Sequence, residues 1–460
     1  MKLDPKDIEK ILSNCKIYKK LLNYNFDRLH MPGHKGLIKI FPDSLSGVYP
    51  FFDVTETDEF DNLLDPKGAI LEFLYDIKSY FNSYFSFVSL QGSTHLLQSI
   101  IFGLSKPFDT IVIARDSHKS IYEAAKLMNL RVEYIYPDYD NQTGITTYYN
   151  IENFEKTIKN SNAKYIFITS PSYFGIIQNI DYLSTIAHKY KKSLIVDEAH
   201  GAHLKFLDGT SSFDLGADIT VQSMHKTLPC PTQSAMIHIK KIDELEKLKK
   251  TLISLHTTSP SYILLLLTEY GFQFAKKYAK ELFSELYCKL YDIFNPIYQN
   301  TNWKYQKIDW TKVVLFLNSK TSESEVLIKN LKDNGYITEL YDKTKVLFYF
   351  TMVDALKDFS ALKKVIYDII KNDNKDFNYY YLPVPKKYIE MYEVDNFKKR
   401  TVKFIECKNT VLAQKITPYP PGIPVVVEGE EVTEDIFEYL MYLKENRIIN
   451  IEEVEILDEW

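Results

Sequence analysis

Lys226, in the segment QSMHKTLP at 222–229, is the residue of this sequence best placed to do chemistry. It follows the apolar run Ile219–Gln222, which is typical of a buried strand. An ammonium at such a strand end must be paired, deprotonated or used covalently, because an unpaired buried charge is costly. A neutral lysine amine forms a Schiff base with an aldehyde, and Ser223 and His225 can reach a phosphate or a carboxylate. The alternative is a structural lysine whose stem covers apolar surface.

Asp197 is the second chemical candidate, because it ends the apolar run LIVD at 194–197 and begins the segment DEAH. The interval between Asp197 and Lys226 leaves room for a helix or loop and one further strand, so both can emerge at one edge of a sheet. Pyridoxal 5′-phosphate (PLP) needs this pair: a lysine binds its aldehyde, and a carboxylate keeps its pyridine nitrogen protonated. The alternative for Asp197 is a helix cap or a loop carboxylate.

Two further segments supply groups that such a cofactor would use. In LQGSTH, Gly92 permits a tight turn, and Ser93 and Thr94 add hydroxyls to the free N–H groups at the start of a helical stretch. Ser and Thr are also ordinary helix caps, so this signal is weak alone. After the run Thr110–Ala114, His118 can stack its ring on the cofactor; a structural histidine is the more common alternative, and the sequence alone does not separate the two.

The elements that must position these residues alternate between short β-rich runs and helical stretches from about residue 68 to 240. The runs lie at 110–114, 132–136, 165–169, 194–197, 219–222 and 235–239. This alternation predicts an α/β fold, with a mainly parallel sheet and helices on both faces. Ligands of such sheets bind at the carboxyl ends of the strands, where the polar candidates also fall.

We predict four segments along the chain. Residues 1–67 form an N-terminal segment, and residues 68–295 form the large domain with the sheet. Residues 296–371 form a smaller α/β domain, and residues 372–460 form a C-terminal domain that begins with a linker rich in Asn, Asp, Lys and Tyr. The fold is therefore expected to add smaller C-terminal α/β domains to the main sheet.

Composition excludes several classes of protein. The formal net charge of -5 gives no basic field for a nucleic-acid backbone. The four cysteines show no CxxC pair, so neither a metal site nor a disulfide framework is expected. They are Cys15, Cys230, Cys288 and Cys407. The N-terminus reads as an amphipathic helix and no run is long enough to span a membrane, which favours a cytoplasmic protein.

Several short motifs follow one another in a specific order along nearly the whole chain. They are LHMPGHK (29–35), DVTET (53–57), GST (92–94), DSHKS (116–120), DEAHGAH (197–203), QSMHKTL (222–228), TTSPSY (257–262) and YPPGIP (419–424). Together they resemble the PLP-dependent ornithine/lysine/arginine decarboxylases of the aspartate-aminotransferase fold (fold type I). The resemblance is to the short form, without the N-terminal wing domain of the large inducible enzymes.

The resemblance implies a role for each candidate residue. Lys226 forms the Schiff base with PLP; Asp197 pairs with the pyridine nitrogen; His118 stacks on the ring; Ser93, Thr94, Ser223 and His225 bind the phosphate; and His200 lies beside the cofactor near the ring oxygen or the substrate. The implied reaction converts arginine, lysine or ornithine to the amine and CO₂, a step of polyamine or diamine formation. The family also implies a homodimer or an assembly of dimers, with residues 1–67 and 257–262 near the interface.

Two departures from the family and three alternatives stay open. His95 follows the GST motif where the family often has a small residue, and Glu428 stands where a proline is frequent.

The letters DEAH suggest a helicase, but this sequence lacks the GxxxxGK[ST] loop that a helicase needs. Another PLP reaction on this fold, such as aminotransfer or side-chain lysis, is the serious competitor, and a regulatory PLP-binding relative is the third. Acidic residues at 428–431 and 53–61 are candidates to bind the distal cation of the substrate.

Overall fold

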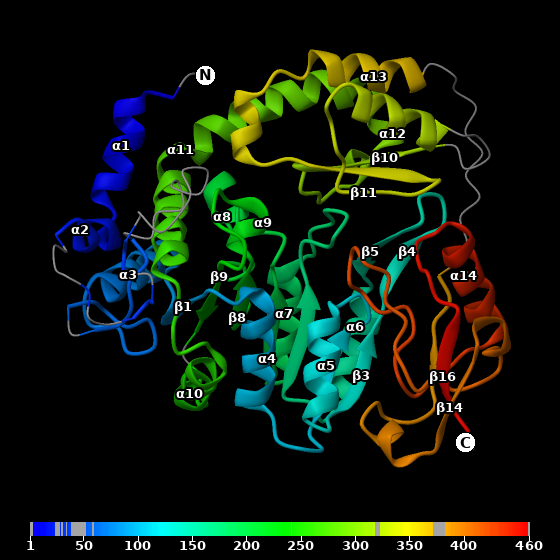
Figure 1. The fold of residues 1–460 in the computed structure, drawn as a ribbon. Helices are drawn as coiled ribbons and strands as arrows, with labels where there is room; N and C mark the ends of the chain where they lie inside the picture. Colours follow the sequence, from blue (N-terminus) through cyan, green and yellow to red (C-terminus); the bar gives the residue numbers. More distant parts are fainter. Residues whose placement is uncertain are drawn as a thin grey trace. The chain divides into compact units, whose positions relative to one another are not determined.

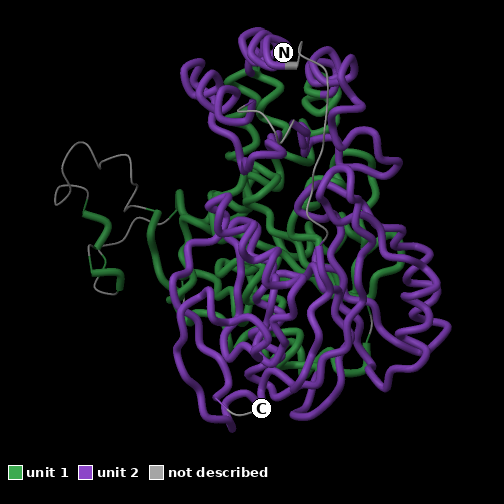
Figure 2. The backbone as a smooth tube through the Cα atoms, turned by 90° about the vertical axis from the view of Figure 1, so that its right-hand side faces the viewer, with its two compact units in different colours: residues 1–104, 198–286, 351–356 green, residues 105–197, 287–350, 357–460 purple. Residues whose placement is uncertain are grey.

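The computed structural model describes most of the chain, in two compact units. The described residues are 3–23, 28, 31–33, 35–37, 52–57, 59–240, 242–317, 323–370 and 382–458. Unit 1 comprises residues 1–104, 198–286 and 351–356, and unit 2 comprises residues 105–197, 287–350 and 357–460 (Figure 2). His30 and His34 of the LHMPGHK motif, and most of the predicted linker, lie outside the described residues. Each unit is thus built from stretches that are far apart in the sequence.

Unit 1 contains the glycine loop and the lysine segment. Its elements are α1 (Pro5–Asn14), α2 (Lys16–Leu22), α3 (Ala69–Phe81), β1 (Phe85–Ser89), α4 (Gly92–Leu104), α8 (Leu204–Leu207), β8 (Ile219–Gln222), α9 (Met224–Thr227), β9 (Ala235–Ile239), α10 (Leu245–Leu255), the η5 turn (Met352–Leu356) and the greater part of α11 (Tyr262–Phe294). β9 pairs antiparallel with β1 and with β8. Helices α4 and α10 lie side by side (Figure 1).

Unit 2 contains four strands of the large sheet and the C-terminal segments. Its large-sheet region has β2 (Thr110–Ala114), α5 (Lys119–Leu127), β3 (Arg131–Ile135), β4 (Pro137–Asp140), β5 (Ile145–Tyr149), α6 (Ile151–Asn160), β6 (Tyr165–Thr169), α7 (Ile180–Lys189) and β7 (Ser193–Asp197). β2 runs parallel to β3 and β6, and β6 runs parallel to β7. Helices α6 and α7 pack on β3 and β7 respectively (Figure 1).

Smaller sheets follow in unit 2. The first has the order β10 (Lys312–Phe316), β12 (Lys345–Tyr349) and β11 (Leu340–Tyr341), with helices α12 (Glu323–Asp333) and α13 (Ser360–Ile370) packed on each other. Two-stranded sheets then pair β13 (Lys386–Lys387) with β15 (Glu430–Glu431), and β14 (Lys399–Lys403) with β16 (Glu453–Leu457). Helix α14 (Glu434–Glu445) contributes Ile436, Leu440 and Leu443 to the C-terminal core.

The large sheet has seven strands in the order β1-β9-β8-β7-β6-β2-β3 and is mainly parallel, which confirms the predicted α/β fold with smaller C-terminal sheets. Strands such as β2 and β8 are buried along almost their whole length. Continuous burial explains their uninterrupted apolar sequences, because a strand covered on both faces has no solvent side for polar residues. Four predicted runs coincide with β2, β6, β8 and β9, whereas β1 and the β4–β5 hairpin were not predicted.

No helix among the described residues combines the length and apolarity needed to cross a bilayer. Nor do they contain a group of three or more His, Cys, Asp or Glu side chains arranged to hold a metal ion.

Candidate active site

Lys226 lies on the short helix α9, directly after β8. Its side chain is partly buried, and its Nζ lies 3.1 Å from His200 Nε2. Since β8 is wholly buried, its end delivers Ser223 and the residues of α9 to the carboxyl edge of the strand. The structure therefore brings together two residues that the sequence predicted for the same site.

Ser223 and Ser93 meet at the start of α4. The Ser223 hydroxyl donates to Ser93 Oγ at 2.9 Å. Gly92 begins the helix with a φ of +74°, a left-handed value that favours glycine, and an added Cβ would find nothing within 4 Å. The first N–H groups of a helix have no partner within the helix, so this turn can receive an anion. Thr94 lies on the same turn with an exposed side chain.

His225 is held by the loop that follows α9. Its Nδ1 donates to the carbonyl of Ser234 at 2.9 Å, and its backbone N–H donates to the same carbonyl at 3.3 Å. Burial lowers the pKa of His225, and the charge of Lys226 lowers it further, while the bond to Ser234 opposes both. The ring is therefore neutral near pH 7. We call Ser93, His200, Ser223, His225 and Lys226 the lysine cluster.

Asp197 is the last residue of β7 and is only 4% exposed. A second buried acid, Asp116, accepts a hydrogen bond from the Tyr149 hydroxyl at 2.9 Å. Burial raises the pKa of Asp116 to about 6; the bond from Tyr149 opposes this rise, and the nearby charge of Asp197 adds to it. We call Asp116, Tyr149 and Asp197 the carboxyl cluster. Because the charge of Asp197 adds to the rise in the pKa of Asp116, these two buried acids form a place where a cation is favoured.

His118 is held between a helix start and a loop from the C-terminal segment of unit 2. It is the N-cap of α5, and its Nδ1 accepts a bond from Ser120 N–H at 3.3 Å. Gly422 has a φ of +82°, and a Cβ added there would lie 3.0 Å from His118 Nε2. The Lys119 N–H donates to the Gly422 carbonyl at 2.9 Å. The YPPGIP loop thus lies directly against the ring predicted to stack on the cofactor.

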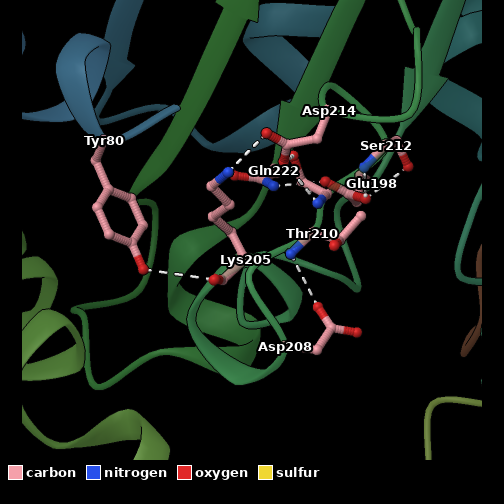
Figure 3. Close-up of polar contacts among 9 residues, drawn as sticks. Tyr80, Glu198, Lys205, Asp208, Thr210, Ser212, Asp214 and Gln222 are labelled. Atoms are coloured by element: carbon pink, nitrogen blue, oxygen red, sulfur yellow. Dashed lines mark hydrogen bonds and ion pairs between the residues drawn. The ribbon is translucent and has the colours of Figure 1, made fainter. Parts of the chain in front are cut away.

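A buried polar network, which sequence reasoning missed, lies next to the lysine cluster in the chain (Figure 3). Glu198 is 0% exposed and accepts bonds from Ser212 N at 2.8 Å, from Ser212 Oγ at 2.6 Å and from the side-chain amide of Gln222. The amide oxygen of Gln222 lies 3.2 Å from His238 Nε2. Burial raises the pKa of Glu198 to about 7, against these hydrogen bonds. The signal for this network was present in the sequence, because Glu198 follows Asp197 and Gln222 precedes Ser223.

Four of the acids proposed for the distal cation of the substrate already have partners. Glu430 pairs with Arg115 at 2.9 Å, and Glu431 pairs with Lys386 at 3.0 Å. Glu428 lies 3.5 Å from Lys126 and 3.6 Å from Lys415. Asp61 accepts five backbone bonds, from Asn62, Lys67, Gly68, Ile70 and Leu71. These contacts make none of the four a strong candidate for a substrate cation.

Within unit 1 the structure joins Ser93 to Ser223 and Lys226 to His200, with His225 beside Lys226. Asp197 and His118 belong to unit 2, and their roles toward Lys226 stay a prediction. The donor set nevertheless fits PLP: hydroxyls and a helix start for the phosphate, a lysine for the aldehyde, and a pair of buried acids for a protonated ring nitrogen.

Comparison with known proteins agrees with this chemistry. Residues 16–289 match the family described as "Orn/Lys/Arg decarboxylase, major domain", and residues 386–449 match its C-terminal domain. The chain therefore belongs to the Orn/Lys/Arg decarboxylase family.

Individual relatives are distant but cover nearly the whole chain. Uncharacterized protein YaaO of Bacillus subtilis is 28% identical, over 94% of each chain. An arginine decarboxylase of the same organism is 27% identical, over 90% of this chain and 89% of its own. The solved lysine decarboxylase A of Pseudomonas aeruginosa, at 16% identity, covers 98% of this chain and 81% of its own with a TM-score of 0.81. This structural likeness confirms the fold predicted from the sequence.

Proposed function

We propose that this protein is a PLP-dependent decarboxylase of arginine, lysine or ornithine. The single observation that carries the proposal is the lysine cluster, in which Lys226 and His200 lie close to each other and Ser223 meets Ser93 at the start of α4. Family membership gives the reaction class, and the relatives named arginine decarboxylase and lysine decarboxylase give the choice of substrates.

Each residue then has a defined task. When bound, PLP supplies an electron sink for the electron pair that the departing carboxylate leaves on the substrate Cα. Lys226 would hold the cofactor through its aldehyde carbon. The hydroxyls of Ser93, Thr94 and Ser223, with His225 and the first turn of α4, hold the phosphate. These contacts fix the orientation of the reacting bond, which is the main contribution of the protein.

The carboxyl cluster is the candidate partner for the ring nitrogen of the cofactor. Asp197 keeps a proton on the pyridine nitrogen, and the buried Asp116 beside it makes a cationic ring more favourable still. His118 would stack on the ring of the cofactor, and the loop at Gly422 lies next to its imidazole.

Proton delivery to the substrate Cα falls to Lys226. His225 is the other candidate that the sequence offers, but burial lowers its pKa, so it carries little proton at neutral pH. His200 Nε2 lies 3.1 Å from Lys226 Nζ and is placed to exchange a proton with it.

The test is CO₂ release from L-arginine, L-lysine and L-ornithine, measured side by side on protein supplied with PLP, with identification of the amine. Borohydride reduction and peptide mapping of the same sample locate the cofactor. Release from one substrate, with the label on Lys226, supports the proposal. No release from any of the three, with the label still on Lys226, would retain the cofactor and reject the decarboxylation.

A different PLP reaction is the second candidate, because one fold can carry aminotransfer or side-chain lysis as well as decarboxylation. A keto acid in place of an amine among the products would identify aminotransfer. We also propose a homodimer or an assembly of dimers, and sedimentation velocity of the PLP-loaded protein tests it.

A further inference from the structure

Two buried histidines lie beneath the loop that leads to α4, and neither was predicted as a site residue. His95 is on the first turns of α4, and His256 follows α10 as its C-cap. They are 6% and 4% exposed, and their rings meet edge to face with centroids 5.1 Å apart. Two buried imidazoles in contact beside this loop call for an explanation.

The bonds of His95 run toward the loop on one side and toward α10 on the other. Its Nε2 lies 3.0 Å from the Leu252 carbonyl, which can only accept, so Nε2 carries the hydrogen. In the neutral ring Nδ1 is then an acceptor, and it takes the Ser89 hydroxyl at 2.9 Å. Ser89 Oγ in turn accepts the Gln91 N–H at 3.0 Å. His95 thus links α10 to the backbone of the loop.

His256 repeats this arrangement with the tautomer reversed. Its Nδ1 donates to the Thr257 carbonyl at 2.9 Å, which leaves Nε2 to accept the Leu90 N–H at 3.2 Å. The Gln91 side chain closes the link by accepting the Thr257 N–H at 2.8 Å. Protonation of Nε2 would set two N–H groups against each other, so this link requires a neutral ring. Burial lowers the pKa of His95 to about 4, helped by the charge of His256, and burial also lowers the pKa of His256.

The three residues held in this way, 89–91, immediately precede Gly92, Ser93 and Thr94. We propose that His95 and His256 form a clamp that fixes residues 89–91 and so presents the first turn of α4 to the phosphate of PLP. The clamp is a positioning device, since neither imidazole is assigned a contact with the cofactor, and it rests on the proposed function. Helices α4 and α10 also approach each other closely away from the clamp, since a Cβ added at Gly103 would lie 3.1 Å from Leu248 Cα.

The test measures PLP affinity of the cofactor-free protein by absorbance titration, beside its melting temperature without PLP. We expect His256→Leu to raise the dissociation constant of PLP about tenfold, as loss of one hydrogen bond in the support predicts. His256→Gln keeps an acceptor at the ε position and should stay within about twofold of the wild type. His95→Leu should match His256→Leu, since each breaks one link to the loop.

Leu248→Ala is the matched control, because it weakens the packing of α10 on α4 without removing a clamp atom. It should lower the melting temperature while leaving the PLP dissociation constant near the wild-type value. An unchanged PLP affinity in both leucine variants of the histidines would overturn the clamp. A wild-type protein that binds no PLP would instead overturn the proposed function itself.

Discussion

The lysine cluster and the carboxyl cluster both follow the ends of buried strands, yet their surroundings differ. Lys226, His200 and His225 are partly buried; His225 is held by the Ser234 carbonyl, and Lys226 Nζ lies beside His200 Nε2. Asp116 and Asp197 are nearly closed off from solvent, and burial governs the pKa of Asp116. A strand end alone therefore does not set the electrostatics of a site. The degree to which the strand end is buried decides whether its polar groups can exchange partners or favour a bound cation.

The largest effect is the loss of turnover on replacing Lys226 or Asp197, and the borohydride-reducible label should distinguish the two clusters. Lys226→Ala should lose both turnover and the borohydride-reducible PLP label, because the covalent link is gone. Asp197→Ala should also reduce turnover to background but keep the label, because only the protonation of the ring nitrogen is affected. Activity and labelling assays on both variants check this. Lys205→Ala, which removes another lysine of unit 1, should retain the label. Near-normal turnover in Asp197→Ala would remove the carboxyl cluster from the mechanism.

The next largest effect is the loss of stability on replacing Glu198, which lies between Asp197 of the carboxyl cluster and His200 of the lysine cluster in the sequence. Glu198→Ala leaves the Ser212 N–H and the Gln222 amide without a buried acceptor, and should cost about 3 kcal/mol of unfolding free energy. Glu198→Gln keeps one acceptor oxygen and should cost about 1 kcal/mol. Urea unfolding measures both. Equal losses in the two variants would show that the network does not depend on the acceptor.

A smaller effect is expected where the C-terminal loop meets His118. Gly422→Ala combines a strained positive φ with a contact of 3.0 Å to the imidazole, and should destabilise the protein by about 2 kcal/mol. Gly209→Ala is the matched control, since Gly209 has a φ of +85° but open space around it. The difference between the two unfolding free energies isolates the contact with His118. If Gly422→Ala also shifts the absorbance of bound PLP, the loop affects the cofactor through the imidazole of His118.

The last effect concerns the pH dependence of stability, and it is confined to acidic pH. The pKa of Asp116 is raised from 3.8 to about 6, so the folded protein holds the proton more tightly than the unfolded chain does. Its contribution is fully present below about pH 3.8 and is lost as the pH rises through about 6. Asp116→Asn should therefore flatten the fall in unfolding free energy between these values, measured by urea unfolding at each pH. An unaltered slope would mean that the carboxyl of Asp116 is not the group that titrates there.

The buried strands were the most predictable part of the fold. β2, β6, β8 and β9 coincide with the predicted runs because burial on both faces demands continuous apolar sequence. β1 was missed because Ser86 and Ser89 interrupt its apolar residues, and those serines are satisfied by His238 and His95. The β4–β5 hairpin, with polar sequences such as PDYD, carries no comparable signal.

For the candidate site, residue types and order gave Lys226, Ser93 and Ser223, because the chemistry of a cofactor restricts them. The partners of Glu198 and His95 could not be predicted in the same way. Ser212 and Leu252 reach them only through tertiary packing, over separations that no local pattern encodes. The sequence shows which groups are present, whereas the packing decides which of them meet.

The division of unit 1 into separate stretches of chain has a consequence for synthesis. β1 is made early, but its antiparallel partner β9 leaves the ribosome only much later, after β2, β3, β6 and β7 of the other unit. The usual order, in which the N-terminal domain folds while the rest is still being translated, is therefore closed to residues 1–104. Until residue 239 has emerged, the backbone N–H and C=O groups of β1 lack their partner strand. We therefore expect a nascent chain stalled before that point to be prone to aggregation and to need a chaperone.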